Sequence, residues 1–336
     1  MAQRSRTASI AAIVLLVGGC ATTPPAASPA PGTVSPPSIR PSTFQPSPPA
    51  ATDDVVRIAL SGAAPDAIVL DGDRAWVLAG EGGSLLEVDL GGAREIRAID
   101  VGFGPTHLVL PDPGTAAIAR FANSGNGFYL VLVDLETGTV GGVATGELGG
   151  LALGADGVVW ALEKADRLLK VDTRAREIRD RAAVDVGENV HMEVQWGAGS
   201  AWVGSDATQT IRLAGSNLAT EATIDVPTGI PFLFEGGLLW GAGPTELWAL
   251  DPSTNTISRH VSLEGVTEIL GLDIEGDEAW LAVRRAGAVG AVLRLDLETG
   301  AVAGEHSVSL PAAVRIGPDR AWVASYLTNE LLGFER

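Results

Sequence analysis

Two histidines and three acidic residues fall at comparable points of a repeating sequence and could do acid–base chemistry. His107 and His191 lie ten and eleven residues before a recurring strand position, and Asp66, Glu193 and Glu268 lie close to the same phase. A neutral imidazole can take up a proton near pH 7, so such a cluster suits general acid–base catalysis or divalent-metal binding. A purely structural role for the two histidines is the simpler interpretation, and it stays open.

The elements that must position these residues come from a repeat. The recurring phrase is well represented by residues 71–90, which contain a Gly/Asp turn, a strand with a tryptophan, a Gly-rich turn and a second strand. Aligning the chain on that strand gives Trp76, Trp160, Trp202, Trp240, Trp280 and Trp322. The first interval is twice the others, so one repeat lacks the tryptophan, and Ala117 takes its place. Seven repeats of about 40 residues predict propeller blades of four strands.

Each repeat contains the same four pieces, and this pattern sets the expected fold class. An apolar strand is followed by the Trp strand, then by a strand that often ends in Asp, then by an alternating strand such as residues 257–261. This spacing of alternating segments and Gly/Asp turns is typical of antiparallel meanders. We expect an all-β, seven-bladed β-propeller with four-stranded antiparallel blades. The tryptophans should pack between neighbouring sheets, although a ring of aromatic ligand contacts is the alternative. The strand-end Asp residues should cap the following turns.

The last repeat is short. After Trp322 the chain has a third strand at residues 330–334 and then ends, whereas residues 54–60 form an extra strand before the first repeat. We therefore expect this N-terminal strand to complete the last blade and to close the ring, which would leave few exposed edges.

The N-terminal residues predict export and lipid anchoring. Residues 1–19 combine Arg4 and Arg6 with a short apolar run and read as a lipoprotein signal peptide. They lead to Val17-Gly18-Gly19-Cys20, which resembles the lipobox of bacterial lipoproteins, in which the cysteine is lipidated; an ordinary secretory signal is the alternative. Residues 20–52 would then be the lipidated Cys20 and a Pro-rich disordered tether, with ten of the 20 prolines. Residues 53–336 would form the propeller, on the extracytoplasmic face of a bacterial membrane.

Charge and motif content exclude several functional classes. The chain has 23 basic and 41 acidic residues, and without Arg4, Arg6 and Arg40 the part after residue 52 carries a formal charge of −21. Such a surface repels phosphate backbones, so nucleic acid is not an expected partner. Walker loops, nucleophile elbows and zinc-type cysteine clusters are absent, since Cys20 is the single cysteine.

The repeated phrases resemble a known group of propellers. Residues 74–77, 200–203 and 320–323 all contain Ala-Trp-Val, and residues 133–138 read Val-Asp-Leu-Glu-Thr-Gly. These phrases resemble YVTN/YncE-like and streptogramin-lyase-like propellers over residues 54–336. The lyase resemblance implies a pair of histidines, a nearby Glu and a metal ion. In that family the histidines lie about one blade apart, whereas His107 and His191 are 84 residues apart.

The loops of one propeller face are expected to carry any ligand contacts, because long loops on a rigid scaffold often carry function. The longest of these loops are residues 123–127 and 284–290. Deeper in the channel, Gln195, Asp273 and Arg315 share one phase, and Asp273 and Arg315 could form a salt bridge. The candidate ligand-binding residues are Asp66, His107, His191, Glu268, Asn126, Arg284, Arg285 and Tyr326.

These observations lead to two main functional hypotheses. The first is a monomeric cell-envelope lipoprotein whose propeller is a non-catalytic module without a cofactor, binding an envelope protein, a glycan or a small ligand. The second is a metal-assisted lyase or hydrolase that uses His107, His191, Glu193 and Glu268, with a divalent metal as cofactor. A scaffold subunit of an envelope complex is a third hypothesis.

Overall fold

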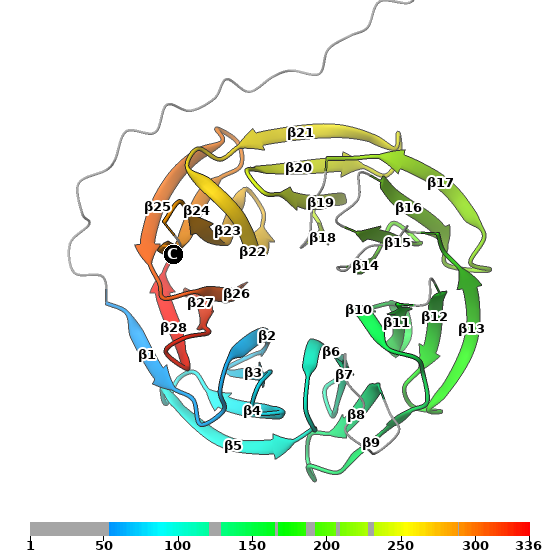
Figure 1. Ribbon diagram of the computed structural model, residues 1–336, viewed down its shortest axis with the longest axis horizontal. Helices are drawn as coiled ribbons and strands as arrows, with labels where there is room; N and C mark the ends of the chain where they lie inside the picture. Colours follow the sequence, from blue (N-terminus) through cyan, green and yellow to red (C-terminus); the bar gives the residue numbers. More distant parts are fainter. Residues whose placement is uncertain are drawn as a thin grey trace, which may run out of the picture. The chain divides into compact units, whose positions relative to one another are not determined.

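The computed structural model describes residues 54–120, 129–164, 167–185, 192–205, 209–227, 232–287 and 289–336. Within these ranges the chain forms seven four-stranded antiparallel sheets, arranged as the blades of a β-propeller (Figure 1). The first strand of each blade lies at the centre of the ring and the fourth lies at the periphery. The predicted fold class is confirmed. The described residues contain no helix with the length and apolar character needed to cross a bilayer.

Blades one to four follow one another along the chain, each as a simple meander. Their strands are β2 (Pro65–Asp71), β3 (Arg74–Ala79), β4 (Ser84–Asp89) and β5 (Arg94–Asp100); β6 (Pro105–Asp112), β7 (Thr115–Arg120), β8 (Leu130–Asp134) and β9 (Val140–Val143); β10 (Leu148–Leu153), β11 (Val158–Glu163), β12 (Arg167–Asp172) and β13 (Glu177–Ala183); and β14 (Met192–Gly197), β15 (Ser200–Ser205), β16 (Gln209–Ala214) and β17 (Thr220–Asp225). A single 3₁₀ turn, η1 (Ala155–Gly157), joins β10 to β11.

Blades five and six have the same meander, and blade seven combines both ends of the domain. Their strands are β18 (Phe232–Glu235), β19 (Leu238–Gly243), β20 (Glu246–Asp251) and β21 (Thr256–Ser262); β22 (Val266–Glu275), β23 (Glu278–Arg285), β24 (Val289–Asp296) and β25 (Ala301–Ser307); and β26 (Pro311–Ile316), β27 (Arg320–Ser325), β28 (Glu330–Glu335) and β1 (Val56–Ala59).

The recurring tryptophans fill the spaces between neighbouring blades, which confirms their predicted packing role. All six are at most 5% exposed. Each lies in a cluster with the next blade; for example, Trp76 packs with Ile118 of blade two, and Trp322 packs with Ile68 of blade one. Cations from the outer strands cover four of the six rings, such as Arg212 over Trp202, with 5.0 Å from Cζ to the ring centroid.

The strand-end aspartates cap their turns as predicted. Asp134 Oδ1 accepts hydrogen bonds from the backbone N–H groups of Glu136 (3.1 Å) and Thr137 (2.8 Å). Asp172 makes the same pair of bonds to the next turn. These bonds stabilise the ionised carboxylates and hold the pKa values of Asp134 and Asp172 below the usual range.

The expected closure of the ring is also confirmed. Strand β1 pairs with β28 in antiparallel register from Val56 opposite Gly333 to Ala59 opposite Glu330. Ile58 is 1% exposed and packs in the cluster between blades seven and one. The N-terminal strand therefore contributes both ladder hydrogen bonds and core packing.

One loop expectation is wrong. Residues 284–290 were expected to form a long loop in blade six, but Arg284 pairs with Gly290 and Arg285 pairs with Val289. Strand β23 runs to Arg285 and β24 begins at Val289, because the β-branched and apolar residues of both strands favour an extended hairpin. The other long loop, residues 123–127, lies outside the described residues.

Closure can be tested with Ile58→Ala, which removes buried methyl groups and should lower the free energy of unfolding by about 2–4 kcal/mol. The matched control is Arg57→Ala, because Arg57 is 61% exposed in side chain and has only a 3.4 Å ion pair to Glu330. That control should change stability by less than about 1 kcal/mol. Thermal melts of both variants make the comparison. Equal melting temperatures, or an unchanged melt after deletion of residues 53–61, would contradict closure by β1.

Candidate functional site

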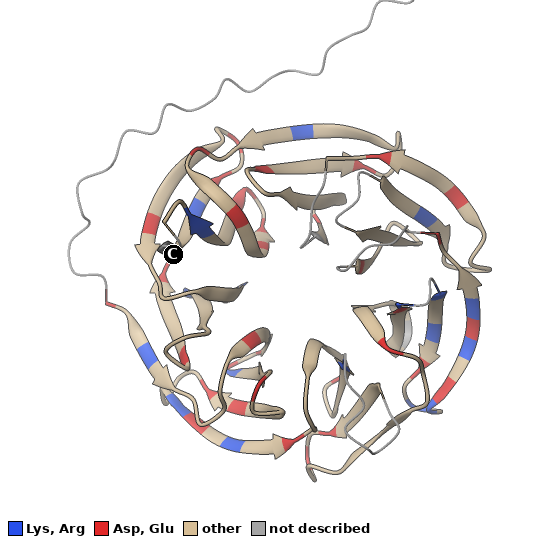
Figure 2. Ribbon diagram, viewed as in Figure 1, with Lys and Arg blue, Asp and Glu red and all other residues tan. Residues whose placement is uncertain are grey.

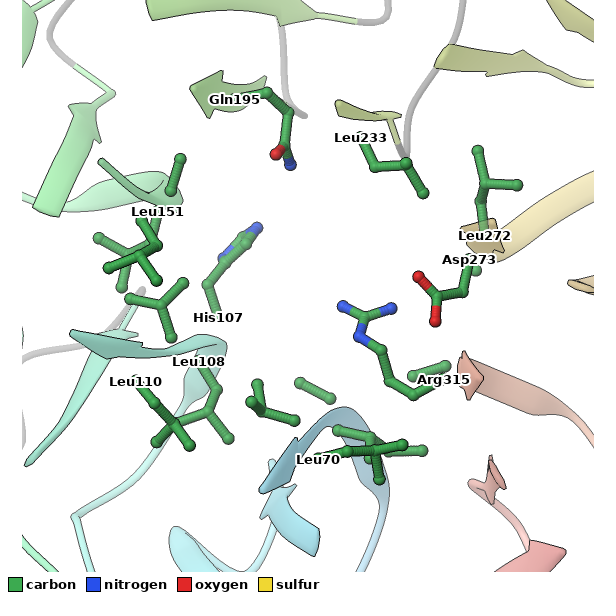
Figure 3. Close-up of a pocket in the computed structure, with 18 of the residues that line it drawn as sticks. Leu70, His107, Leu108, Leu110, Leu151, Gln195, Leu233, Leu272, Asp273 and Arg315 are labelled. Atoms are coloured by element: carbon green, nitrogen blue, oxygen red, sulfur yellow. The ribbon is translucent and has the colours of Figure 1, made fainter. Parts of the chain in front are cut away.

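The innermost strands of the blades surround an axial cavity of about 870 Å³. Its walls come from β2, β6, β10, β14, β18, β22 and β26, so each blade contributes its first strand (Figure 3). Each first strand pairs with the Trp strand of its own blade. A lining residue can therefore be assigned to a level along the channel axis by the residue that it faces on the Trp strand. The position opposite the recurring tryptophan serves as the middle level.

Small residues predominate at the level two residues before the middle one on each first strand. In the described part of the chain it contains Ala67, His107, Gly150, Glu193, Gly271 and Ala313. His107 and Glu193 are therefore the two long side chains at this level, and they come from blades two and four. The structure brings these two predicted residues together.

His107 reaches Glu193 across the intervening blade. The distance from His107 Nε2 to Glu193 Oε1 is 3.4 Å. Blade three presents Gly150 between them, and a Cβ at that position would lie 3.2 Å from Met192 O and Val194 N. The absence of a side chain at Gly150 thus lets β14 approach β10 closely.

The hydrogen bonds around His107 suit an imidazolium rather than a general base. Its Nδ1 lies 3.0 Å from Thr106 Oγ1, which in turn donates to Ala119 O at 3.4 Å. With the Thr106 proton directed at that carbonyl, Nδ1–H donates to Thr106 and Nε2–H donates to Glu193. Burial acts to lower the pKa of His107, but the charge and hydrogen bond of Glu193, with the charge of Asp66, raise it above its ordinary value.

Asp66 is a carboxyl at the same end of the cavity. Burial raises its pKa from 3.8 to about 7, and the charge of His107 only partly opposes this. Its Oδ1 is enclosed and has no hydrogen-bond partner among the described residues. The other oxygen is close to Gly80, where a Cβ would lie 2.6 Å from Oδ2. Glycine at position 80 therefore makes room for this carboxyl.

The middle level carries a second polar group. Gln195, Asp273 and Arg315 share this level, and Arg315 and Asp273 point toward each other (Figure 3). The expected direct salt bridge is absent from the ion pairs of the described residues. Asp273 Oδ2 instead accepts the Ile316 N–H at 2.7 Å, and Arg315 Nη1 donates to Val314 O at 2.8 Å. Burial raises the pKa of Asp273, and Arg315 opposes the shift through its charge.

An apolar ring that we had not predicted lies one residue after the middle level on each first strand. Each blade contributes one large apolar side chain there, namely Leu70, Leu110, Leu153, Trp196, Phe234, Ile274 and Ile316. The recurrence of this position relative to the tryptophan was a detectable signal. Beyond this ring, Asp71, Asp112 and Glu235 line the opposite end of the cavity.

Three predicted binding residues are engaged elsewhere. Arg284 forms an ion pair with Glu268, so Glu268 does not join His107 as the acid–base hypothesis required. Arg285 makes bidentate contacts with Glu305 at 2.8 and 2.9 Å. None of these residues lines the cavity, since Glu268 and both arginines lie on the hairpin side of blade six.

Tyr326 and the remaining candidates have different outcomes. The Tyr326 hydroxyl donates to Glu81 Oε1 at 3.2 Å, in a loop beside the Asp66 end of the cavity. His191, Asn126 and Cys20 lie outside the described residues. The two other histidines lie on the outer strands β21 and β25. His260 is 48% exposed in side chain, whereas His306 is half-buried and stacks on Phe334 with 4.4 Å between centroids.

The metal hypothesis depends on residues that converge. Among the described residues, no three His, Cys, Asp or Glu side chains come together in a way that suits a metal ion. Figure 2 shows acidic residues on the inner strands β2 and β22, while Lys and Arg gather on the outer strands β12 and β13. The cavity wall is thus more acidic than the rim of blade three.

The fold and cavity define the chain as a seven-bladed β-propeller with a polar axial site. No protein-family model matches the sequence, and no curated protein matches it. Among solved structures, the chain is similar to the crystal structure of the computationally designed Ika8 protein, with a TM-score of 0.60 and 12% identity. The match covers 82% of this chain and 98% of that chain. At this identity the similarity shows the fold alone.

The raised pKa of Asp66 gives a pH-dependent stability. Unfolded Asp66 loses its proton near pH 3.8, whereas folded Asp66 keeps it up to about pH 7. The free energy of unfolding therefore falls as pH rises between these values. We expect Asp66→Asn to be more stable than the wild type at pH 8, by on the order of 2 kcal/mol after allowance for screening at the channel mouth.

At pH 4.5 the two proteins should differ much less, since folded Asp66 is then neutral. Urea denaturation at both pH values measures the effect. Asp71→Asn, which neutralises an exposed carboxyl at the other end of the same strand, is the control and should show no such pH dependence. An Asp66→Asn effect of equal size at both pH values would contradict this account.

Proposed function

We propose that this chain is an exported, lipid-anchored and non-catalytic binding module whose propeller takes a small ligand in the axial cavity. The observation that carries the proposal is the cavity itself. Its volume of about 870 Å³ lies within the range of small-molecule sites. Its wall combines apolar side chains with convergent polar groups, among them Asp66, His107, Glu193 and Gln195.

The contacts of His107 favour binding over catalysis. Both ring nitrogens already have partners in Glu193 and Thr106, so the imidazole is held as a hydrogen-bonded cation. Thr106 carries the only hydroxyl among the described residues that line the cavity, and its proton is directed at a backbone carbonyl. The pairing of a hydroxyl nucleophile with an unengaged imidazole, on which Ser–His acyl transfer depends, is therefore missing among the described residues of this wall.

The cellular setting of the proposal comes from the N-terminal sequence. The basic start, the short apolar run and Gly18-Gly19-Cys20 support signal cleavage and lipidation of Cys20. The Pro-rich segment to residue 52 would then hold a monomeric propeller away from an extracytoplasmic membrane surface. The Ala-Trp-Val and Asp-Leu-Glu-Thr-Gly phrases support a place near the YVTN/YncE-like propellers.

Lipid anchoring can be tested with Cys20→Ser in the full chain. We expect the wild type to partition into the detergent phase of a Triton X-114 extraction and to incorporate an alkyne-labelled fatty acid. The variant should lose both properties, because residue 20 carries the proposed acyl chains. Ser28→Ala in the tether is the control and should behave as the wild type. Labelling of the Cys20→Ser protein would contradict the lipoprotein assignment.

Ligand binding in the cavity can be tested by filling it. Ala312 lines the cavity, whereas Ala303 is exposed on the outer strand β25. Saturation-transfer NMR with a mixed library of small amines, carboxylates, sugars and neutral aromatics should detect compounds that lose their signal in Ala312→Trp and keep it in Ala303→Trp. Ala67→Phe, at the same end of the cavity, is a second blocking variant if Ala312→Trp melts early. The proposal is wrong if no compound distinguishes the blocked variants from the control.

A further inference from the structure

The charges of the cavity wall are unbalanced. Six carboxyl residues line it, against one histidine and one arginine; the carboxyl residues are Asp66, Asp71, Asp112, Glu193, Glu235 and Asp273, and the cationic residues are His107 and Arg315. The wall therefore favours a positively charged occupant and disfavours an anion.

The contacts of the lining carboxyls distinguish Asp66 from Asp273 and Glu193. Arg315 faces Asp273, which also accepts the Ile316 N–H. Glu193 lies 3.4 Å from His107. Asp66 forms no ion pair among the described residues, and the charge of His107 only partly offsets the burial of its carboxyl. A buried carboxylate without an ion pair is costly, and a cationic ligand beside it in the cavity would offset that cost.

An apolar surface lies within reach of that carboxyl. The strand β2 carries both Asp66 and Leu70, so about 13 Å of strand separates them at roughly 3.3 Å per residue. Leu70 and Leu110 belong to the apolar ring, and the close-up shows both beside the cavity (Figure 3). The cavity thus combines an anionic end with an apolar wall further along the axis.

We propose that the ligand is an amphipathic organic ammonium ion. Its cationic head donates hydrogen bonds to Asp66 and lies beside Glu193, and its hydrocarbon body lies along the apolar ring. This inference rests on the proposed function, because it names the ligand class of the same cavity. An inorganic divalent cation fits less well, since no three acidic or histidine ligands converge in the described residues.

Binding should depend on pH through the groups that surround Asp66. These are His107 from β6, Glu193 from β14, and Tyr326 with Glu81 from the adjacent loops. A primary ammonium has a pKa near 10.4 and stays charged from pH 5.5 to 8. Protonation of Asp66 removes the anionic partner, because burial raises the pKa of this carboxyl to about 7. Affinity should therefore fall as pH is lowered from 8 to 5.5.

Isothermal titration of the full chain with four probes tests the proposal. The probes are hexylammonium, 1-hexanol, hexanoate and methylammonium, which separate the charge from the hydrocarbon body. At pH 8 we expect hexylammonium to bind at least about tenfold more tightly than 1-hexanol, as one charge-assisted hydrogen bond provides. Methylammonium should bind at least about tenfold more weakly than hexylammonium, since five methylene groups are lost. Hexanoate should not bind.

Two matched variants locate the head group. Asp66→Asn should weaken hexylammonium about tenfold or more and leave 1-hexanol unchanged. Asp225→Asn, on the exposed outer strand β17 and away from the cavity lining, should change hexylammonium binding less than about twofold. Equal binding of hexylammonium and hexanoate, no binding of hexylammonium, or equal effects of the two variants would overturn the proposal.

The cavity-filling variants distinguish failure of the ammonium assignment from failure of the proposed function. If hexylammonium fails while neutral or anionic library compounds are displaced by Ala312→Trp, the cavity is a binding site and the ammonium assignment is wrong. If no compound of any charge distinguishes Ala312→Trp from Ala303→Trp, both proposals fail.

Discussion

A single layer of apolar side chains holds each blade to the next, and every other feature of the domain depends on that layer. Adjacent blades share no ladder hydrogen bonds, since each sheet contains only its own four strands. Contact between them is therefore mainly side-chain packing, with a tryptophan at most 5% exposed in six of the seven repeats. Side-chain hydrogen bonds such as that from the Ile316 N–H to Asp273 add to it. A wide indole suits this place because the gap between twisted sheets must be filled completely. Where the tryptophan is missing, Ala117 and Leu151 occupy the same cluster instead.

The same packing fixes the size of the axial site. Large residues between the blades hold the first strands apart around the axis, and small residues on those strands keep the interior open. Ala67, Gly150, Gly271 and Ala313 all occur at the level of His107. A Cβ at Gly150 would lie 3.2 Å from Met192 O, and one at Gly271 would lie 3.1 Å from Ala313 Cα. Glycine at these positions therefore lets the neighbouring first strands approach each other closely.

The architecture could be predicted from the sequence because it repeats. The same blade pattern occurs seven times, so deviations from it could be recognised in the sequence. These were the missing tryptophan near Ala117 and the N-terminal strand Val56–Ala59, which completes the last blade. The site is predictable only in part. The positions of Asp66, His107 and Glu193 relative to the recurring tryptophan predicted that they lie at one end of the channel. Contacts across the axis did not follow, because the reach of His107 past Gly150 depends on three-dimensional spacing between blades.

The errors have a common physical origin. Glu268 has nearly the phase of Glu193, yet it forms an ion pair with Arg284 on the neighbouring strand of its own blade. The position of a residue in the repeat predicts its level along the channel axis, but not the direction of its side chain where a β-bulge bends the strand. Strand β22 has two such shifts of register, between Val266 and Glu268 and between Ile269 and Gly271. The strands with the candidate acids Asp66 and Glu268 both carry such bulges at the channel mouth, whereas β14 with Glu193 keeps regular pairing. Regular pairing keeps Glu193 at the level of His107, and the bulge in β2 places the Asp66 carboxyl beside Gly80, where burial outweighs the charge of His107. The chemistry of the site therefore lies in the irregular positions of a regular fold.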